Sequence, residues 1–105
     1  MSLSTKQIKQ FRAIGHRLKP VVTVSGGLGD NVLAETARAL SDHELIKVKI
    51  NAEDRELKKL LVEELCAQSG AELVQLIGNV ALIYRPARTP DPRLSNLLRH
   101  KELLD

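Results

Sequence analysis

The chain has 105 residues, 43% of them hydrophobic, and a formal net charge of +3 from 16 Lys and Arg against 13 Asp and Glu. This length fits one ordinary domain with a single compact core, and no apolar run approaches the roughly 18 residues that a membrane-spanning helix needs. The one cysteine, Cys66, excludes a disulfide framework and a multi-cysteine zinc site, and the scarcity of aromatic residues, Phe11 and Tyr84 alone, argues against platforms that stack bases. The N-terminus lacks the apolar core of a signal peptide, so we expect a cytoplasmic protein.

The first segment predicts an amphipathic helix over about residues 5–17. Ser4 and Gln7 fit a capping box at its start. Apolar residues then recur at helical spacing, and on a helical wheel the basic residues fall on the opposite side. The apolar stripe is Ile8, Phe11, Ile14 and Leu18, and the basic side carries Lys6, Lys9, Arg12, His16 and Arg17. Because residues 1–29 contain no Asp or Glu, we interpret this basic side as a nucleic-acid contact rather than a solvated helix face.

A short strand, a glycine loop and a helix start follow one another directly. Pro20 ends the first helix, Val21 to Val24 predict a strand, and a second helix is expected from Asp30 or Asn31 to about Asp42. Glycines let the loop backbone approach a ligand closely, and the unpaired N–H groups and dipole of a helix start favour an anion. The sequence therefore predicts a site for a nucleic-acid backbone, with a positive field from the preceding segment. Its loop residues are Ser25, Gly26, Gly27, Leu28 and Gly29, and its basic residues are Lys6, Lys9, Arg12, Arg17 and Lys19.

Residues 45–50 alternate between apolar and polar, which predicts a strand with two different faces. Its core face carries Ile46, Val48 and Ile50. Lys47 and Lys49 then lie side by side on the opposite surface, where we expect them to extend the RNA contact.

The rest of the chain completes the expected fold. Leu57, Leu60, Leu61 and Leu65 mark a third helix that ends near Ser69-Gly70, and two β-rich runs, 72–77 and 80–85, flank a Gly78-Asn79 hairpin turn. The resulting order, α-β-α-β-α-β-β, predicts an α/β (two-layer α+β) domain with a mixed four-stranded sheet. With three helices available, one face of the sheet is expected to stay partly open.

Prolines separate a C-terminal tail from this domain. Pro86, Pro90 and Pro92 interrupt the chain, and Asp91-Pro92 is the expected start of a terminal helix. That helix would carry Leu94, Leu97, Leu98 and Leu104. We therefore divide the chain into an RNA-binding domain, residues 1–86, and a tail, residues 87–105. The sequence leaves three arrangements of the tail open: folding back on the domain, pairing with another copy, or ordering on RNA.

Three blocks of the sequence resemble a known family. The segments 18–22 (LKPVV), 43–50 (HELIKVKI) and 77–86 (IGNVALIYRP) look like the CRM domain (chloroplast RNA splicing and ribosome maturation), over roughly residues 3–86. Within it the chain is most similar to the stand-alone bacterial YhbY type, which is associated with precursors of the large ribosomal subunit. The resemblance implies a small α/β domain similar to the C-terminal domain of bacterial translation initiation factor three. It also implies RNA contact through a GxxG loop, of which Gly27-Leu28 fits the end, while Val24 or Ser25 stands where the first glycine is expected.

Taken together, these features predict a protein that binds RNA and needs no cofactor, metal, membrane or small-molecule substrate. It would hold the phosphate backbone of structured ribosomal RNA during assembly of the 50S subunit, a target that comes from the resemblance alone.

Gly27-Leu28-Gly29 superficially begins a dinucleotide-binding motif, but its third glycine and a P-loop ending are missing. His16, His43 and His100 are scattered and form no acid–base pair with a carboxylate, so we do not expect an enzyme. The alternative is a protein-interaction module in which the glycine loop is a structural turn and the leucine-bearing tail is the partner surface; the oligomeric state stays open.

Overall fold

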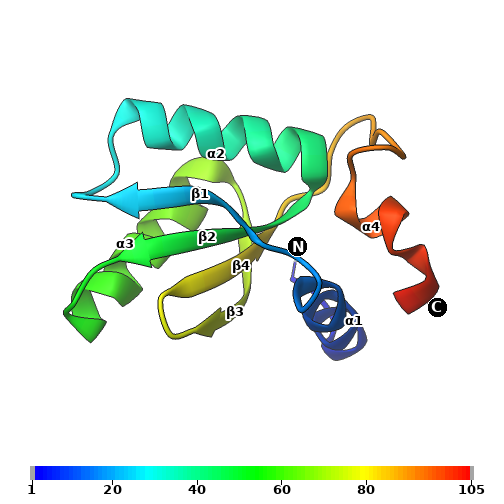
Figure 1. Ribbon diagram of the computed structural model, residues 1–105, viewed down its shortest axis with the longest axis horizontal. Coiled ribbons are helices and arrows are strands. Elements are labelled where there is room, and N and C mark those ends of the chain that lie inside the picture. The colour runs from blue at the N-terminus through cyan, green and yellow to red at the C-terminus, as the bar shows by residue number, and fades with distance from the viewer. Residues whose placement is uncertain (1, 105) are drawn as a thin grey trace.

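The computed structural model describes residues 2–104 of the chain, so residues 1 and 105, the outer limits of the predicted domain and tail, lie outside the described part. The chain folds into the expected α/β arrangement with a mixed four-stranded sheet (Figure 1). The elements are α1 (Thr5–Gly15), β1 (Pro20–Ser25), α2 (Asp30–His43), β2 (Leu45–Asn51), α3 (Arg55–Ser69), β3 (Glu72–Ile77), β4 (Val80–Tyr84), α4 (Asn96–Arg99) and the 3-10 turn η1 (Lys101–Leu103). The predicted element order is therefore confirmed from α1 to β4.

The sheet has the strand order β1-β2-β4-β3, with β1 parallel to β2 and β4 antiparallel to both of its neighbours. The crossovers through α2 and α3 place both helices on one face, as right-handed connections require. The main core lies between these helices and the sheet. Its buried members are Val22, Val24, Leu40, Ile46, Val48, Ile50, Val62, Leu65, Ala81 and Ile83.

Helix α1 covers only one end of the opposite sheet face. Phe11 and Ile14 pack there against Leu45, Val74 and Leu82. The contact is close because α1 ends in Gly15, where an added Cβ would lie 2.7 Å from the nearest methyl carbon of Leu82. Figure 1 shows α1 at the end of the sheet away from the loop that joins β1 to α2. No helix among residues 2–104 lies over the remainder of this face, which we call the open face.

The leucines of α3 do not all face the core as the pattern suggested. Leu65 is fully buried and Leu61 packs against the core, but Leu57 and Leu60 keep 48% and 61% of their surface exposed. The buried side of the helix is completed instead by Val62 and Ser69. Helical spacing located the helix correctly and overstated the width of its apolar stripe.

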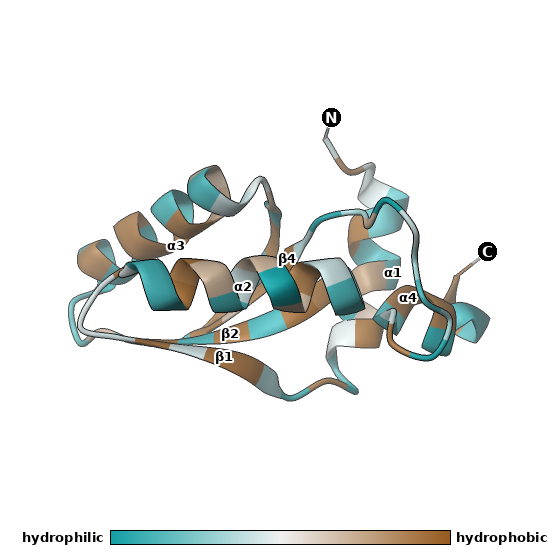
Figure 2. Cartoon of the chain, turned by 90° about the horizontal axis from the view of Figure 1, so that it is seen from above, coloured by the Kyte–Doolittle hydropathy of each residue, from teal (hydrophilic) through white to brown (hydrophobic). Residues whose placement is uncertain are grey.

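The described part of the tail folds back beside α1. Figure 2 shows α4 and α1 side by side, and Leu97, Leu103 and Leu104 pack against the cluster that α1 forms with the sheet. The terminal helix begins at Asn96, not at Asp91-Pro92, because the Ser95 side chain caps it by accepting a hydrogen bond from Leu98 N. It spans four residues, much less than the leucine spacing implied.

A buried carboxylate, Glu44, fastens the tail to the domain. Its two oxygens accept hydrogen bonds from Ser95 Oγ and from Ala87 N, both at 2.7 Å. Beside them, Asn96 Nδ2 donates to Leu45 O at 2.7 Å. Glu44 is 5% exposed and has φ +63°, a conformation that residues other than glycine rarely adopt. The backbone turn between α2 and β2 thus aims this carboxylate at the tail.

We expect Glu44→Ala to lower the free energy of unfolding by about 2–4 kcal/mol, because the Ser95 hydroxyl and the Ala87 N–H lose a charged acceptor in a buried place. Urea unfolding followed by circular dichroism measures this change. Glu63→Ala, on the exposed side of α3, is the matched control and should change stability by less than about 0.5 kcal/mol. Equal stability of the two variants would contradict the role given to Glu44.

Cys66 lies on α3 and packs, half-buried, against the main core. Burial raises the pKa of its thiol from 9.0 to about 11, because apolar surroundings disfavour the charged thiolate. At pH 8 the thiolate fraction should therefore be about 100-fold smaller than in the unfolded chain. We expect iodoacetamide to label Cys66 about 100-fold more slowly in the native protein than in urea. Similar labelling rates in the two states would show that the thiol is not buried.

Candidate nucleic-acid interface

The glycine loop between β1 and α2 exposes its backbone. Gly26 has φ +78° and Gly27 has φ +116°, values in the left-handed region that favours glycine. A Cβ added at Gly26, Gly27 or Gly29 would meet no atom within 4 Å. Gly26 and Gly27 therefore allow the left-handed turn of the backbone. The open space beside the three glycines lets a ligand approach the main chain closely.

Side chains at both ends of the loop hold it in place. Leu28 turns inward and packs against the main core. Ser25 Oγ accepts a hydrogen bond from Asn51 Nδ2 at 2.9 Å, which ties the end of β1 to the end of β2. Gly29 is the N-cap of α2 and supplies no capping side chain, while Asp30 places a carboxylate in the first turn. Of the five predicted loop residues, Leu28 is thus a structural anchor, and the other four present backbone at the surface.

The two predicted strand lysines lie on the open face in line with the loop. The parallel register places Lys47 opposite Pro20 and Lys49 opposite Thr23. One step further, Asn51 lies opposite Ser25, where the loop begins. A polar row therefore runs along β1 and β2 from α1 to the glycine loop. We call this row, with the loop, the open-face track; it consists of Lys47, Lys49, Thr23, Asn51 and residues 25–29.

Helix α1 borders the near end of this track. Arg12 donates from Nε and Nη2 to the side-chain oxygen of Gln75 at 2.8 and 3.1 Å, with the amide oriented so that its oxygen faces the guanidinium. His16, Gln75 and Lys47 share a hollow of about 240 Å³ between α1 and the sheet. Lys47 Nζ also donates to Leu18 O at 3.2 Å, which fixes the lysine beside this hollow.

The other predicted basic residues lie elsewhere around α1. Lys6 and Lys9 are exposed on the solvent side of the helix, near Leu103 of the tail. Arg17 pairs with Glu102 of the tail at 2.9 Å, and both side chains are about half exposed. Lys19 precedes β1 on the side away from the open-face hollow. The structure thus brings Arg12, Lys47 and Lys49 to the open face, leaves Lys6 and Lys9 on the solvent side of α1, and places Arg17 and Lys19 before the start of β1.

Sequence reasoning missed three polar residues of this surface. Asn51 continues the alternation that places the lysines on one face of β2. Thr23 alternates in the same way with Val22 and Val24 on β1, so the sequence carried a signal for both residues. Gln75 had no such signal, because an irregularity in the pairing of β3 with β4 between Leu73 and Gln75 shifts the faces of β3.

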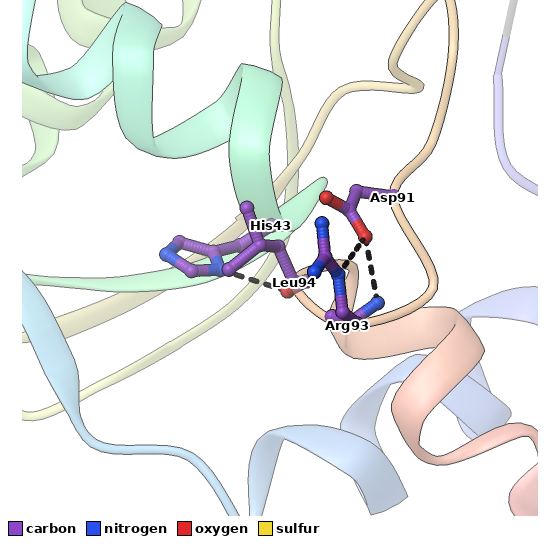
Figure 3. A network of polar contacts seen from close by, with 4 residues as sticks. All are labelled: His43, Asp91, Arg93 and Leu94. Carbon is purple, nitrogen blue, oxygen red and sulfur yellow. Dashed lines mark hydrogen bonds and ion pairs between the residues drawn. The ribbon is translucent and has the colours of Figure 1, made fainter.

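Two of the three histidines, His43 and His100, have structural partners in the fold. His43 Nδ1 lies 2.8 Å from Leu94 O, as Figure 3 shows, and since a carbonyl only accepts, this nitrogen carries the hydrogen. His100 Nδ1 lies 3.9 Å from Glu102. Among residues 2–104 there is no group of three or more His, Cys, Asp or Glu side chains placed to hold a metal ion. Within the same residues no helix has the length and apolar character needed to cross a membrane.

The ring of Tyr84 packs on Phe11 with centroids 4.8 Å apart. Burial, together with the negative charges of Glu44 and Glu72, raises the pKa of the Tyr84 hydroxyl. The two aromatic rings of the chain thus pack on each other in the contact between α1 and the sheet, where Phe11 is buried and Tyr84 is partly buried.

Comparison with known proteins shows the family of the chain. Residues 3–85 match the model of the CRS1 / YhbY (CRM) domain. A Pseudomonas aeruginosa protein named as a probable RNA-binding protein is 53% identical over 94% of this chain and 96% of its own length. A Haemophilus influenzae protein named as an RNA-binding protein is 45% identical over 82% of this chain and 88% of its own.

Among solved structures, the solution structure of a Staphylococcus aureus protein superposes with a TM-score of 0.74 and 32% identity, covering 84% of this chain and 93% of that one. The match at the level of sequence and the match at the level of fold cover the same element order, α1 to β4. The chain belongs to the CRS1 / YhbY (CRM) domain family.

Proposed function

We propose that the protein binds the phosphate backbone of structured RNA along the open-face track. The observation that carries this proposal is the position of the glycine loop, which continues the row formed by Lys47 and Lys49. Loop amides at residues 26–29 donate to phosphate oxygens, and the lysines neutralise the neighbouring phosphates. Lys6, Lys9, Arg12, Arg17 and Lys19 add a positive field around the start of β1 and draw RNA toward this end of the sheet.

The dimensions of the track suit a short stretch of nucleic-acid backbone. Strand β1 has six residues and so extends over about 20 Å from the side of α1 to the loop. The partners offered along it are amides, lysines and short polar side chains, which contact phosphates and sugars more readily than base edges. Phe11 is buried and Tyr84 is partly buried in the α1 contact, so recognition rests on the shape and backbone of the RNA.

The biological target that we propose is ribosomal RNA in precursors of the large subunit, in the cytoplasm. RNA binding is supported by the names of the relatives, and the ribosomal target rests on the resemblance to the YhbY type. We assign this binding to residues 1–86, with residues 87–105 as an added tail.

The alternative function, a protein-interaction module, depends on an exposed leucine surface on the tail, and most of that surface is covered. It required the leucines of the tail to face a partner, but Leu97, Leu103 and Leu104 pack against the α1 cluster of their own domain. Leu94 and Leu98 keep 37% and 38% of their surface exposed, which is a small area for a stable interface.

Gly27→Asp should weaken RNA binding at least about tenfold. The substitution places a negative charge beside the proposed phosphate site and a Cβ at φ +116°. Fluorescence anisotropy with a labelled rRNA hairpin at fixed salt measures the affinity. Gly70→Asp is the matched control, because it makes the same charge change at another left-handed glycine, the C-cap of α3 at the opposite end of the sheet. Equal affinities for the two variants would remove the loop from the interface.

Sedimentation of a cell lysate through sucrose gradients tests the target. At low salt we expect the protein to migrate with large-subunit precursors, and at high salt to remain at the top, because phosphate contacts weaken as counterions are added. Migration at the top of both gradients would contradict the ribosomal target, and anisotropy with purified RNA would still test RNA binding itself.

A further inference from the structure

A second cationic surface lies where the tail meets the start of β1. There an open pocket of about 290 Å³ is formed by the end of α1, the first residues of β1, the end of α2 and the tail. Its basic lining residues are Arg17, Lys19, His43, Arg99 and His100, and no Asp or Glu lines it. We call it the tail pocket. It shares no lining residue with the open-face hollow beside Lys47.

The walls of the tail pocket are fixed by hydrogen bonds across the chain. Asn96, a lining residue only 7% exposed, donates to Leu45 O, and the neighbouring Ser95 donates to Glu44. Figure 3 shows His43 reaching from the end of α2 to Leu94 O, so that its second ring nitrogen lies on the far side of the ring. The pocket is therefore part of the folded structure and does not depend on a loose tail.

Nearby carboxylates leave most of this positive charge uncompensated. Glu102 lies 2.9 Å from Arg17 and 3.9 Å from His100. Asp91 is engaged by Arg93, whose backbone and side chain lower the pKa of that carboxyl. Among the described residues, none of the ion pairs involves Lys19 or Arg99. A concave surface of one sign concentrates its field and attracts an anion of opposite sign.

The size of the pocket limits what it can hold. Pockets for whole cofactors and drug-sized ligands span roughly 300–1,000 Å³, and the tail pocket lies at the bottom of that range. Its lining also includes the apolar residues Leu18, Val21 and Ile46 and the neutral amide of Asn96. A phosphate group with its attached sugar fits these properties, because arginine and lysine side chains bind phosphate through charge-assisted hydrogen bonds.

We propose that the tail pocket binds a phosphate of the same RNA that lies on the open-face track. This inference rests on the proposed function and adds a contact to it. Arg17 and Lys19 join the two surfaces, since they lie in the connection between α1 and β1. β1 is an edge strand and Val21 is half exposed, so RNA passing around this edge meets no covering element among the described residues. Arg99 and His100 lie beyond residues 3–85, so the contact is additional to the family domain.

The test compares two tail arginines. Arg99 lines the pocket, whereas Arg93 is bound to Asp91, has a side chain 89% exposed and is not a lining residue. We expect Arg99→Ala to weaken binding of a labelled rRNA hairpin about threefold to tenfold at low salt, and to reduce the slope of log K against log salt by about 0.7 to 0.9. Arg93→Ala should leave the slope unchanged. Equal slopes for Arg99→Ala and the parent protein, at equal melting temperatures, would overturn the proposal.

Other measurements separate this proposal from the proposed function. If Arg99→Ala binds like the parent while Gly27→Asp binds weakly, the tail pocket is not an RNA site and the open-face track still is. If the parent itself fails to bind RNA, both proposals fail. Titration with inorganic phosphate, followed by NMR, tests whether the occupant is a free anion. If phosphate shifts the signals of Lys19 and Arg99 equally with and without bound RNA, an RNA phosphate is not the occupant. If bound RNA abolishes these phosphate-induced shifts, the proposal is supported.

Discussion

Strand β2 divides the molecule into a core side and a binding side. It is hydrogen-bonded to β1 on one edge and to β4 on the other, so neither its register nor its faces can shift without breaking both ladders. Its even-numbered residues from Ile46 to Ile50 are almost fully buried under α2 and α3. The same constraint turns Lys47 and Lys49 to the open face. The hydrophobic core and the charged row are thus two consequences of one side-chain period.

The parallel pairing of β1 with β2 then fixes where the glycine loop lies. Because Ser25 is opposite Asn51 and the two side chains are hydrogen-bonded, the chain leaves the sheet at the end of the lysine row. The left-handed conformations of Gly26 and Gly27 turn it toward α2, and Leu28 returns it to the core. A loop with exposed amides is therefore held at both of its ends. This restraint lowers the entropy that would otherwise be lost when the loop binds a ligand.

The local pattern of the sequence predicted the elements, because each has its own signal. The capping box at Ser4 and the alternation in β2 act within a few residues, and both appear in the structure. Pro20 lies in β1 instead of ending the first helix, which already ends at Gly15. Contacts between distant residues were not predictable in this way. Glu44 and Ser95 are 51 residues apart, and Arg17 and Glu102 are 85 apart, so no local period links them.

The candidate site was predictable to the same extent. Strand alternation and glycine spacing indicated the lysines and the loop, which are local features. A helical wheel showed that the basic residues of α1 avoid the core, but it could not show which neighbour each would meet. Arg12 faces Gln75 because of an irregular pairing in β3, and Arg17 faces the tail because Glu44 holds the tail there. The division of the basic residues between two surfaces is a tertiary property.

The placement of these two surfaces constrains the RNA that the proposals require. The glycine loop and the tail pocket lie near opposite ends of β1, a strand of about 20 Å in a sheet that does not change length. Two phosphate contacts at a fixed separation favour an RNA whose backbone already has that separation, since a flexible single strand loses entropy when both of its ends are held. A folded RNA element loses little of this conformational entropy on binding, because its backbone is already ordered. Selectivity for structured RNA can therefore arise from the spacing of backbone contacts, in a protein whose two aromatic rings pack on each other beside α1.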